Sequence, residues 1–310
     1  MMIPSTKGRV ALAMGPVLFN WPVEQWSDFY AQLADETAID IVYLGEVVCS
    51  KRTPFYLSAM ADAVGRLQRG GKTVVLSTLA LITLMRERKE CAELVGYDGC
   101  EIEVNDLTAL ANWDRGKPFH IGPYVNVYNE DTLAFLAGLG ASSVCLPPEL
   151  PFQAVEILAA KSHSLGIGCE VWSFGRIPLA ISGRCYHARI DGLTKDACQF
   201  GCARDSDGLE VSSLNGKGFL AINGVQTLSY TYSNVITHVD RLETAGVTAL
   251  RLSPHSFNMR GVSRVFRDRL DRRIDGEEAL SRIQAICGLV SFSNGFLFGE
   301  AGAEMITSPD

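Results

Sequence analysis

Short apolar segments alternate with amphipathic ones along most of this chain, and this alternation limits the possible fold more than any other feature. Eight segments have the character of buried strands, at residues 10–14, 39–44, 73–76, 99–104, 119–122, 143–146, 168–172 and 248–252. Helix-like segments lie between most of them, at residues 23–34, 55–69, 81–95, 130–139 and 152–165. Strands that alternate with helices through short links indicate an α/β protein with parallel strands. Eight such strands predict a (β/α)8 TIM-like barrel, with a doubly wound open sheet as the alternative.

The alternation is interrupted between residues 176 and 233. Within this stretch Asn223-Gly224 lies between two apolar runs, which predicts a β-hairpin. We interpret residues 176–233 as an insertion after the seventh strand. A helix over residues 233–245 should then lead to the eighth strand, and two further helices are expected at 258–270 and 277–289. We expect a single barrel domain over residues 1–310, because no segment resembles a linker.

Nine cysteines are spread along the chain, and four of them have polar, turn-rich neighbours: Cys49, Cys185, Cys198 and Cys202. The other five lie in strand-like or helix-like segments, where a free thiol packs as a small apolar group: Cys91, Cys100, Cys145, Cys169 and Cys287. Four thiolates from two distant segments suit a soft metal centre, either an iron–sulfur cluster or zinc. In a barrel, sites form at the carboxyl ends of the strands. Since one cysteine follows strand two and three follow strand seven, all four should meet at the same mouth.

The composition limits the compartment and the partners. The net charge of −7 makes the chain a poor binder of polyanions, so general nucleic-acid binding is not expected. The first apolar run, residues 10–19, is interrupted by Pro16 and is interpreted as a strand rather than a signal sequence. No apolar stretch approaches the roughly 20 residues of a membrane span. We therefore expect a cytoplasmic protein, in which clustered cysteines favour metal over disulfides.

Four carboxylates and several basic residues fall at the ends of the expected strands. The carboxylates belong to Glu46, Glu103, Glu149 and Glu170. They could perform acid–base chemistry, or they could be buried in pairs with arginine or lysine. His255 follows the eighth strand, while His120 and His163 are expected to be structural. Glu46, Glu103, Glu170 and Arg251 are the candidate catalytic residues, and no pattern in the sequence ranks them.

Several segments together resemble the collagenase-like peptidase U-32 family. They are residues 43–52 (Tyr-Leu-Gly-Glu-Val-Val-Cys-Ser-Lys-Arg), 76–80, 175–185 and 223–227, and the resemblance runs from about residue 13 to 299. It implies a [4Fe-4S] cluster bound by Cys49, Cys185, Cys198 and Cys202. It also implies a sister subunit of the same family, forming a heterodimer that hydroxylates the ubiquinone precursor ring without oxygen in anaerobic bacteria. Prephenate is the implied oxygen donor. No protease constellation, such as a nucleophile elbow or a His-Glu-x2-His helix, accompanies the family's name.

Two other functions are compatible with this resemblance: an RNA-modifying hydroxylase, and a non-catalytic partner whose cluster only shapes a subunit interface. A cluster held by four thiolates leaves no open iron, so electron transfer, redox sensing or structural support is expected rather than substrate activation. A dianionic substrate such as prephenate would need arginine partners. The candidates are Arg52, Arg184, Arg189 and Arg251.

Overall fold

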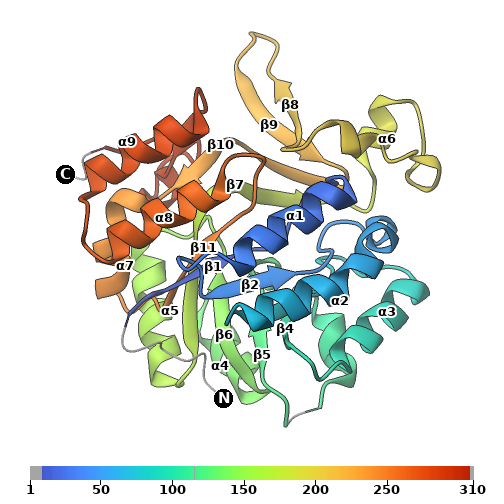
Figure 1. The fold of residues 1–310 in the computed structure, drawn as a ribbon, viewed down its shortest axis with the longest axis horizontal. Coiled ribbons are helices and arrows are strands. Elements are labelled where there is room, and N and C mark those ends of the chain that lie inside the picture. The colour runs from blue at the N-terminus through green and yellow to red at the C-terminus, as the bar shows by residue number, and fades with distance from the viewer. Residues whose placement is uncertain (1–8, 115, 308–310) are drawn as a thin grey trace.

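Eight parallel strands form a closed barrel in the computed structural model, which describes residues 9–114 and 116–307 (Figure 1). The strands are β1 (Ala11–Met14), β2 (Ile41–Leu44), β3 (Thr73–Ser77), β4 (Glu101–Val104), β5 (Phe119–Ile121), β6 (Ala141–Leu146), β7 (Gly168–Ile181) and β11 (Ala249–Leu252). Neighbours pair in chain order from β1 to β7, and β11 pairs with both β7 and β1. Because β11 joins the two ends, the predicted barrel is confirmed and the open sheet is wrong.

Helices surround the barrel, and most of them connect successive barrel strands (Figure 1). They are α1 (Val23–Ala34), α2 (Thr53–Arg69), α3 (Met85–Val95), α4 (Glu130–Gly138), α5 (Phe152–Ser164), α7 (Val239–Thr244), α8 (Met259–Leu270) and α9 (Gly276–Cys287). In α1 the buried residues Trp26, Tyr30 and Leu33 recur every three or four positions, which places them on the face toward the sheet. Gly70 ends α2, and a side chain there would collide with the carbonyl oxygen of Ala34. Among the described helices, none has both the length and the apolar character that a membrane span requires.

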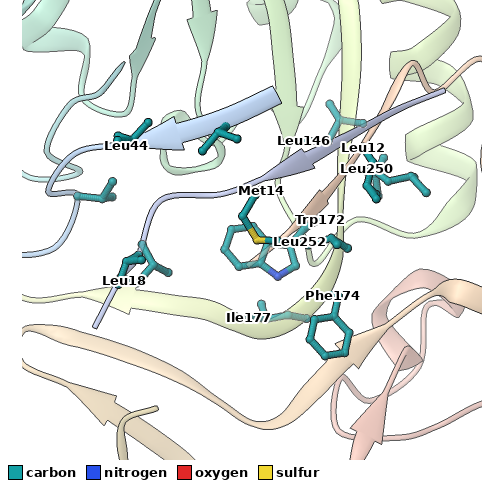
Figure 2. Close-up of a cluster of buried hydrophobic side chains, with 14 of the residues drawn as sticks. Leu12, Met14, Leu18, Leu44, Leu146, Trp172, Phe174, Ile177, Leu250 and Leu252 are labelled. Carbon is teal, nitrogen blue, oxygen red and sulfur yellow. The ribbon is translucent and has the colours of Figure 1, made fainter. Parts of the chain in front are cut away.

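The main hydrophobic core lies between the barrel and the helices. Leu12 and Met14 of β1 belong to it, together with Leu250, Leu252 and Trp172 (Figure 2). Burying one such large apolar side chain stabilises the fold by roughly 1.5–3 kcal/mol. Successive side chains of a strand point to opposite faces. The alternate residues of β1 therefore point into the barrel, where they belong to a separate small cluster: Ala11, Ala13, Ile41, Tyr43, Val75 and Ala249.

The insertion between β7 and β11 extends the sheet away from the barrel. β7 continues to Ile181 and pairs in antiparallel fashion with β10 (Gln226–Asn234), which pairs with β9 (Gly218–Asn223) and then with β8 (Leu209–Ser212). The hairpin of β8 and β9 projects from the body of the protein (Figure 1). The short helix α6 (Tyr186–Ile190) contacts β9. The short strand β12 (Phe292–Ser293) also pairs with β10.

The hairpin predicted at Asn223-Gly224 is present, and the helix predicted over residues 233–245 is partly wrong. Asn223 and Gln226 face each other across a two-residue turn, and Gly224 has a φ of 66°, which favours glycine. Ser233 and Asn234 are buried and continue the ladder between β10 and β7. The helix therefore begins only at Val239, after a 3-10 turn at Ile236–His238.

Candidate functional site

The four cysteines with polar neighbours come together at the mouth of the barrel. Cys49 follows β2, Cys185 immediately precedes α6, and Cys198 and Cys202 lie in the loop after α6. All four side chains line one cavity, together with Lys51, Arg52, His187, Lys195, Phe200, Gly201 and Gly224. The other five cysteines do not line it. The structure thus brings together residues that are more than a hundred positions apart in the sequence.

The loop between Cys198 and Cys202 has an unusual backbone. Gln199 and Phe200 have φ values of 48° and 53°, in the left-handed region that non-glycine residues rarely adopt. Such a conformation costs on the order of 1–3 kcal/mol per residue and persists where the surroundings impose it. Here the Phe200 ring packs edge-on against Phe55, with 4.7 Å between ring centroids. The tight turn allows both cysteines to face the same cavity.

Two polar side chains fix this loop to the rest of the mouth. The Lys51 ammonium donates to the backbone carbonyls of Lys195 and Asp196, at 2.9 Å each. The His187 ring accepts the Gly224 amide at Nδ1 (2.9 Å). Its other nitrogen, Nε2, therefore carries the proton and lies 3.0 Å from the Asp205 carboxylate.

Burial lowers the pKa of His187, against the pull of Asp205, so the neutral ring is the form that fits this bridge. Sequence reasoning alone did not predict a role for His187. The structure shows it as the bridge between the cysteine loop and the hairpin turn.

Arg52 is buried beside the cysteines and is committed to structural contacts. Its guanidinium donates to the Leu18 carbonyl and to Asn223 Oδ1, at 2.8 Å each, and lies 3.9 Å from Glu46 Oε1. It therefore has limited capacity to bind a substrate carboxylate. Burial raises the pKa of the Cys49 thiol, and the nearby Arg52 opposes that shift. Burial likewise raises the pKa of the Cys185 thiol, so metal binding at these positions must release protons.

The cysteine cavity is small and is not shaped for one ion. Its volume is about 10 Å³, close to the space of one water molecule. Within residues 9–114 and 116–307, no three or more His, Cys, Asp or Glu side chains converge on a single metal-ion position. The donor set nevertheless fits a thiolate-bound group, because Asn20 Nδ2 points to Cys202 Sγ at 3.6 Å and basic side chains line the same cavity.

Three of the candidate catalytic residues form a buried ion-pair network inside the barrel. The Arg251 guanidinium lies 2.6 Å from Glu103 Oε1 and 2.6 Å from Glu170 Oε2, and all three side chains are at most 2% exposed. Tyr43 donates to Glu170 at 2.9 Å, and its ring lies 3.9 Å from the guanidinium carbon. Ser77 donates to Glu103 at 2.7 Å. Each carboxylate therefore has a cation and a hydroxyl partner within the network.

The remaining candidates lie elsewhere. Glu149 bonds to the exposed Tyr128, and Arg184 and Arg189 are exposed on the insertion. The buried His255 accepts the Arg176 amide at Nε2 and faces Asp207 across 3.3 Å, so it anchors the end of the insertion's cysteine loop to β11.

Comparison with known proteins identifies a family. The model described as "Peptidase family U32" matches residues 23–307. Three solved structures are more distantly similar. An uncharacterized B. cereus protein is 12% identical with a TM-score of 0.40; the match covers 79% of this chain and 60% of that one.

A putative fructose-1,6-biphosphate aldolase from Coccidioides immitis is also 12% identical, with a TM-score of 0.40 over 91% of this chain and 88% of that chain. A chain of the tryptophan synthase complex from Pyrococcus furiosus is 14% identical, with a TM-score of 0.39 over 90% and 98%. Likeness at this level carries no argument about activity. The family match, in contrast, covers nearly the whole chain, and the protein belongs to peptidase family U32.

Proposed function

We propose that this chain binds a [4Fe-4S] cluster through Cys49, Cys185, Cys198 and Cys202. The observation that carries the proposal is that these four cysteines, drawn from two distant segments, line one cavity while the other five lie elsewhere. In a four-iron cluster each thiolate binds a different iron, so the ligands need not converge on one point as they must around zinc.

The neighbouring residues suit a negatively charged group. Lys51, Arg52 and Lys195 line the cavity and would offset the charge of four thiolates and the cluster. The Asn20 amide that points to Cys202 supplies a hydrogen bond to sulfur, a contact that raises reduction potentials. When bound, a cluster of this type supplies electron transfer without an open iron. The residues around it hold and tune that group.

We further propose that the chain acts like the ubiquinone biosynthesis protein UbiV, as one subunit with its sister UbiU. The pair would hydroxylate the ubiquinone precursor ring without oxygen, with prephenate as oxygen donor. This proposal rests on the sequence segments that resemble that branch of the family and on the cysteine site they contain. The Arg251 network is not arranged to bind a dianion, because its guanidinium already serves two carboxylates. We therefore propose that prephenate binds outside that network.

The test is genetic complementation without oxygen. A bacterial strain that lacks UbiV is supplied with this chain, and its ubiquinone content is measured after anaerobic growth. We expect the wild-type chain and Cys100→Ala to restore ubiquinone, and Cys49→Ala and Cys202→Ala to fail. Cys100 is a matched control because it is half-buried like Cys49 but lies away from the site. If the wild-type chain leaves the ubiquinone content of the deletion strain unchanged but alters the modified nucleosides of its RNA, the proposal is contradicted and the RNA hydroxylase is favoured.

A further inference from the structure

Asn20 lies in the loop after β1 and contacts the cysteine site, although this loop contains none of the four cysteines. The residue is only 5% exposed, and its Nδ2 lies 3.6 Å from Cys202 Sγ. On the opposite side, Asn20 Oδ1 accepts the hydroxyl of Tyr56 at 3.0 Å. One amide group therefore joins a cysteine of the site to a tyrosine of α2.

The contact with Tyr56 determines which end of the Asn20 amide faces the sulfur. The Tyr56 hydroxyl has one proton and lies near two accepting oxygens, Asn20 Oδ1 at 3.0 Å and the Trp21 carbonyl at 3.2 Å. Because Oδ1 is held by this donor, the NH₂ group is the end that points to Cys202. A neutral thiol could donate to an amide oxygen, whereas a thiolate can only accept. The observed orientation therefore suits a deprotonated sulfur, the form that binds metal.

Packing between two helices holds the Tyr56 ring in place. Tyr56 is buried, and its ring stacks on Trp26 of α1, with 5.4 Å between the ring centroids and 21° between the ring planes. Trp26 in turn packs against Tyr30, with 4.5 Å between the ring centroids. Helices α1 and α2 therefore fix the Tyr56 hydroxyl, and the hydroxyl fixes the Asn20 amide.

The cysteine cavity also contains a donor that has no acceptor. Arg52 lines this cavity, and its buried Nε has no hydrogen-bond partner among residues 9–114 and 116–307. A buried N–H group without an acceptor is unfavourable. The Arg52 Nε and the Asn20 amide therefore both favour an acceptor group in this cavity. The sulfur atoms of a thiolate-bound cluster are acceptors of this kind.

We propose that Asn20 and Tyr56 together set the reduction potential of the cluster, with Asn20 as the hydrogen-bond donor to Cys202 and Tyr56 as the positioning residue. This inference rests on the proposed function and deepens it, because it assigns roles to two residues that are not ligands. A hydrogen bond to a ligand sulfur strengthens as the cluster gains an electron, so the donor favours the reduced form and raises the potential. Loss of the Tyr56 hydroxyl frees the amide to rotate, which weakens the donation and leaves all four cysteines unchanged.

The test is a redox titration of the cluster-loaded chain, followed by the electron paramagnetic resonance signal of the reduced form. Asn20→Leu branches at the same carbon but has no N–H group, and Tyr56→Phe keeps the ring. We expect Asn20→Leu to lower the equilibrium constant for reduction between about twofold and tenfold, as for one hydrogen bond. Tenfold corresponds to about 59 mV for one electron. Tyr56→Phe should shift the potential less, in the same direction, and should add nothing to Asn20→Leu in the double variant, because it acts through the amide.

The matched control is Tyr30→Phe. Tyr30 is a buried tyrosine of the same aromatic group, but its hydroxyl donates to the Tyr43 carbonyl (3.2 Å), and its removal should leave the potential unchanged. Should Asn20→Leu fail to load, the comparison of Tyr56→Phe with Tyr30→Phe decides.

Iron and sulfide contents are measured first, so that this inference and the proposed function can fail separately. A wild-type chain without a cluster would overturn both together. With a full cluster, three results would each overturn this inference alone: an unchanged potential in Asn20→Leu or in Tyr56→Phe, additive shifts in the double variant, or a shift in Tyr30→Phe equal to that in Tyr56→Phe.

Discussion

Replacing Arg251 with methionine should strongly destabilise the barrel. The guanidinium lies 2.6 Å from carboxylate oxygens of both Glu103 and Glu170, and all three side chains are at most 2% exposed. Methionine fills much of the same space and cannot pair with a carboxylate. The variant therefore leaves two buried negative charges without their cation.

The expected loss follows from buried ion pairs in general. Removing one partner of such a pair costs about 3–5 kcal/mol, chiefly because the other charge stays buried and unpaired. One cation serves two carboxylates here, so we expect the upper part of that range, about 4–5 kcal/mol. In a triple variant that combines Arg251→Met with Glu103→Gln and Glu170→Gln, no buried charge remains without a partner. Ser77 and Tyr43 can still donate to the amide oxygens, and the loss should shrink to about 1–2 kcal/mol.

The assay is urea unfolding, followed by tryptophan fluorescence and by circular dichroism. Coincident transitions by the two probes establish that one free energy of unfolding describes the process. The comparison that decides is between the single and the triple variant. If the triple variant loses as much stability as Arg251→Met alone, the cost arises from packing and the electrostatic reasoning is refuted.

Two further predictions concern backbone geometry and pH. Gly45 and Gly71 both have positive φ (126° and 75°), but only at Gly45 would a Cβ approach a carbonyl oxygen of β3, at 2.6 Å. Gly71→Ala should cost about 1–2 kcal/mol of unfolding free energy and Gly45→Ala at least about 2 kcal/mol more; equal melting temperatures would contradict this difference. Burial lowers the pKa of His255, and the nearby Arg176 lowers it slightly further, while Asp207 acts in the opposite direction. Because folding lowers the pKa of His255, its contribution to the free energy of unfolding is fully present above the unfolded-state pKa near 6.5. That contribution is lost as the pH falls through the folded-state pKa. The melting temperature should therefore fall between about pH 7.5 and pH 5, less steeply in His255→Gln; parallel curves for the two proteins would show that His255 is not responsible.

The barrel could be predicted because each of its strands is short and apolar, and its neighbours in space are mostly its neighbours in sequence. The extension of the sheet could not. β7 was expected to end at residue 172, and it continues through Gly175 and Pro178, residues that usually interrupt strands. Its partner β10 lies about fifty residues later, so local patterns contain little information about this pairing. The same pairing explains why Ser233 and Asn234 are strand rather than helix.

The meeting of the four cysteines follows from strand order, because loops at the carboxyl ends of parallel barrel strands share one mouth. The contacts that hold the cysteine site in place, in contrast, could not be predicted from strand order. The bridge from His187 to the hairpin and the commitment of Arg52 to backbone and amide oxygens depend on three-dimensional packing. From the sequence, Glu103 and Arg251 could have been catalytic residues or members of a buried ion pair. Successive side chains of a strand point to opposite faces. The positions of Glu103 and Arg251 within their strands could therefore have predicted that both side chains point into the barrel.

The central claim is that Cys49, Cys185, Cys198 and Cys202 together hold one iron–sulfur cluster. The most direct measurement is the iron and acid-labile sulfide content of the chain purified without oxygen, for the wild type, each cysteine-to-alanine variant at these positions, and Cys100→Ala. We predict about four iron and four sulfide per chain for the wild type and Cys100→Ala, and a marked loss in all four ligand variants. A colourless wild-type protein with one zinc and no sulfide would contradict the claim, as would iron retained in any of the four.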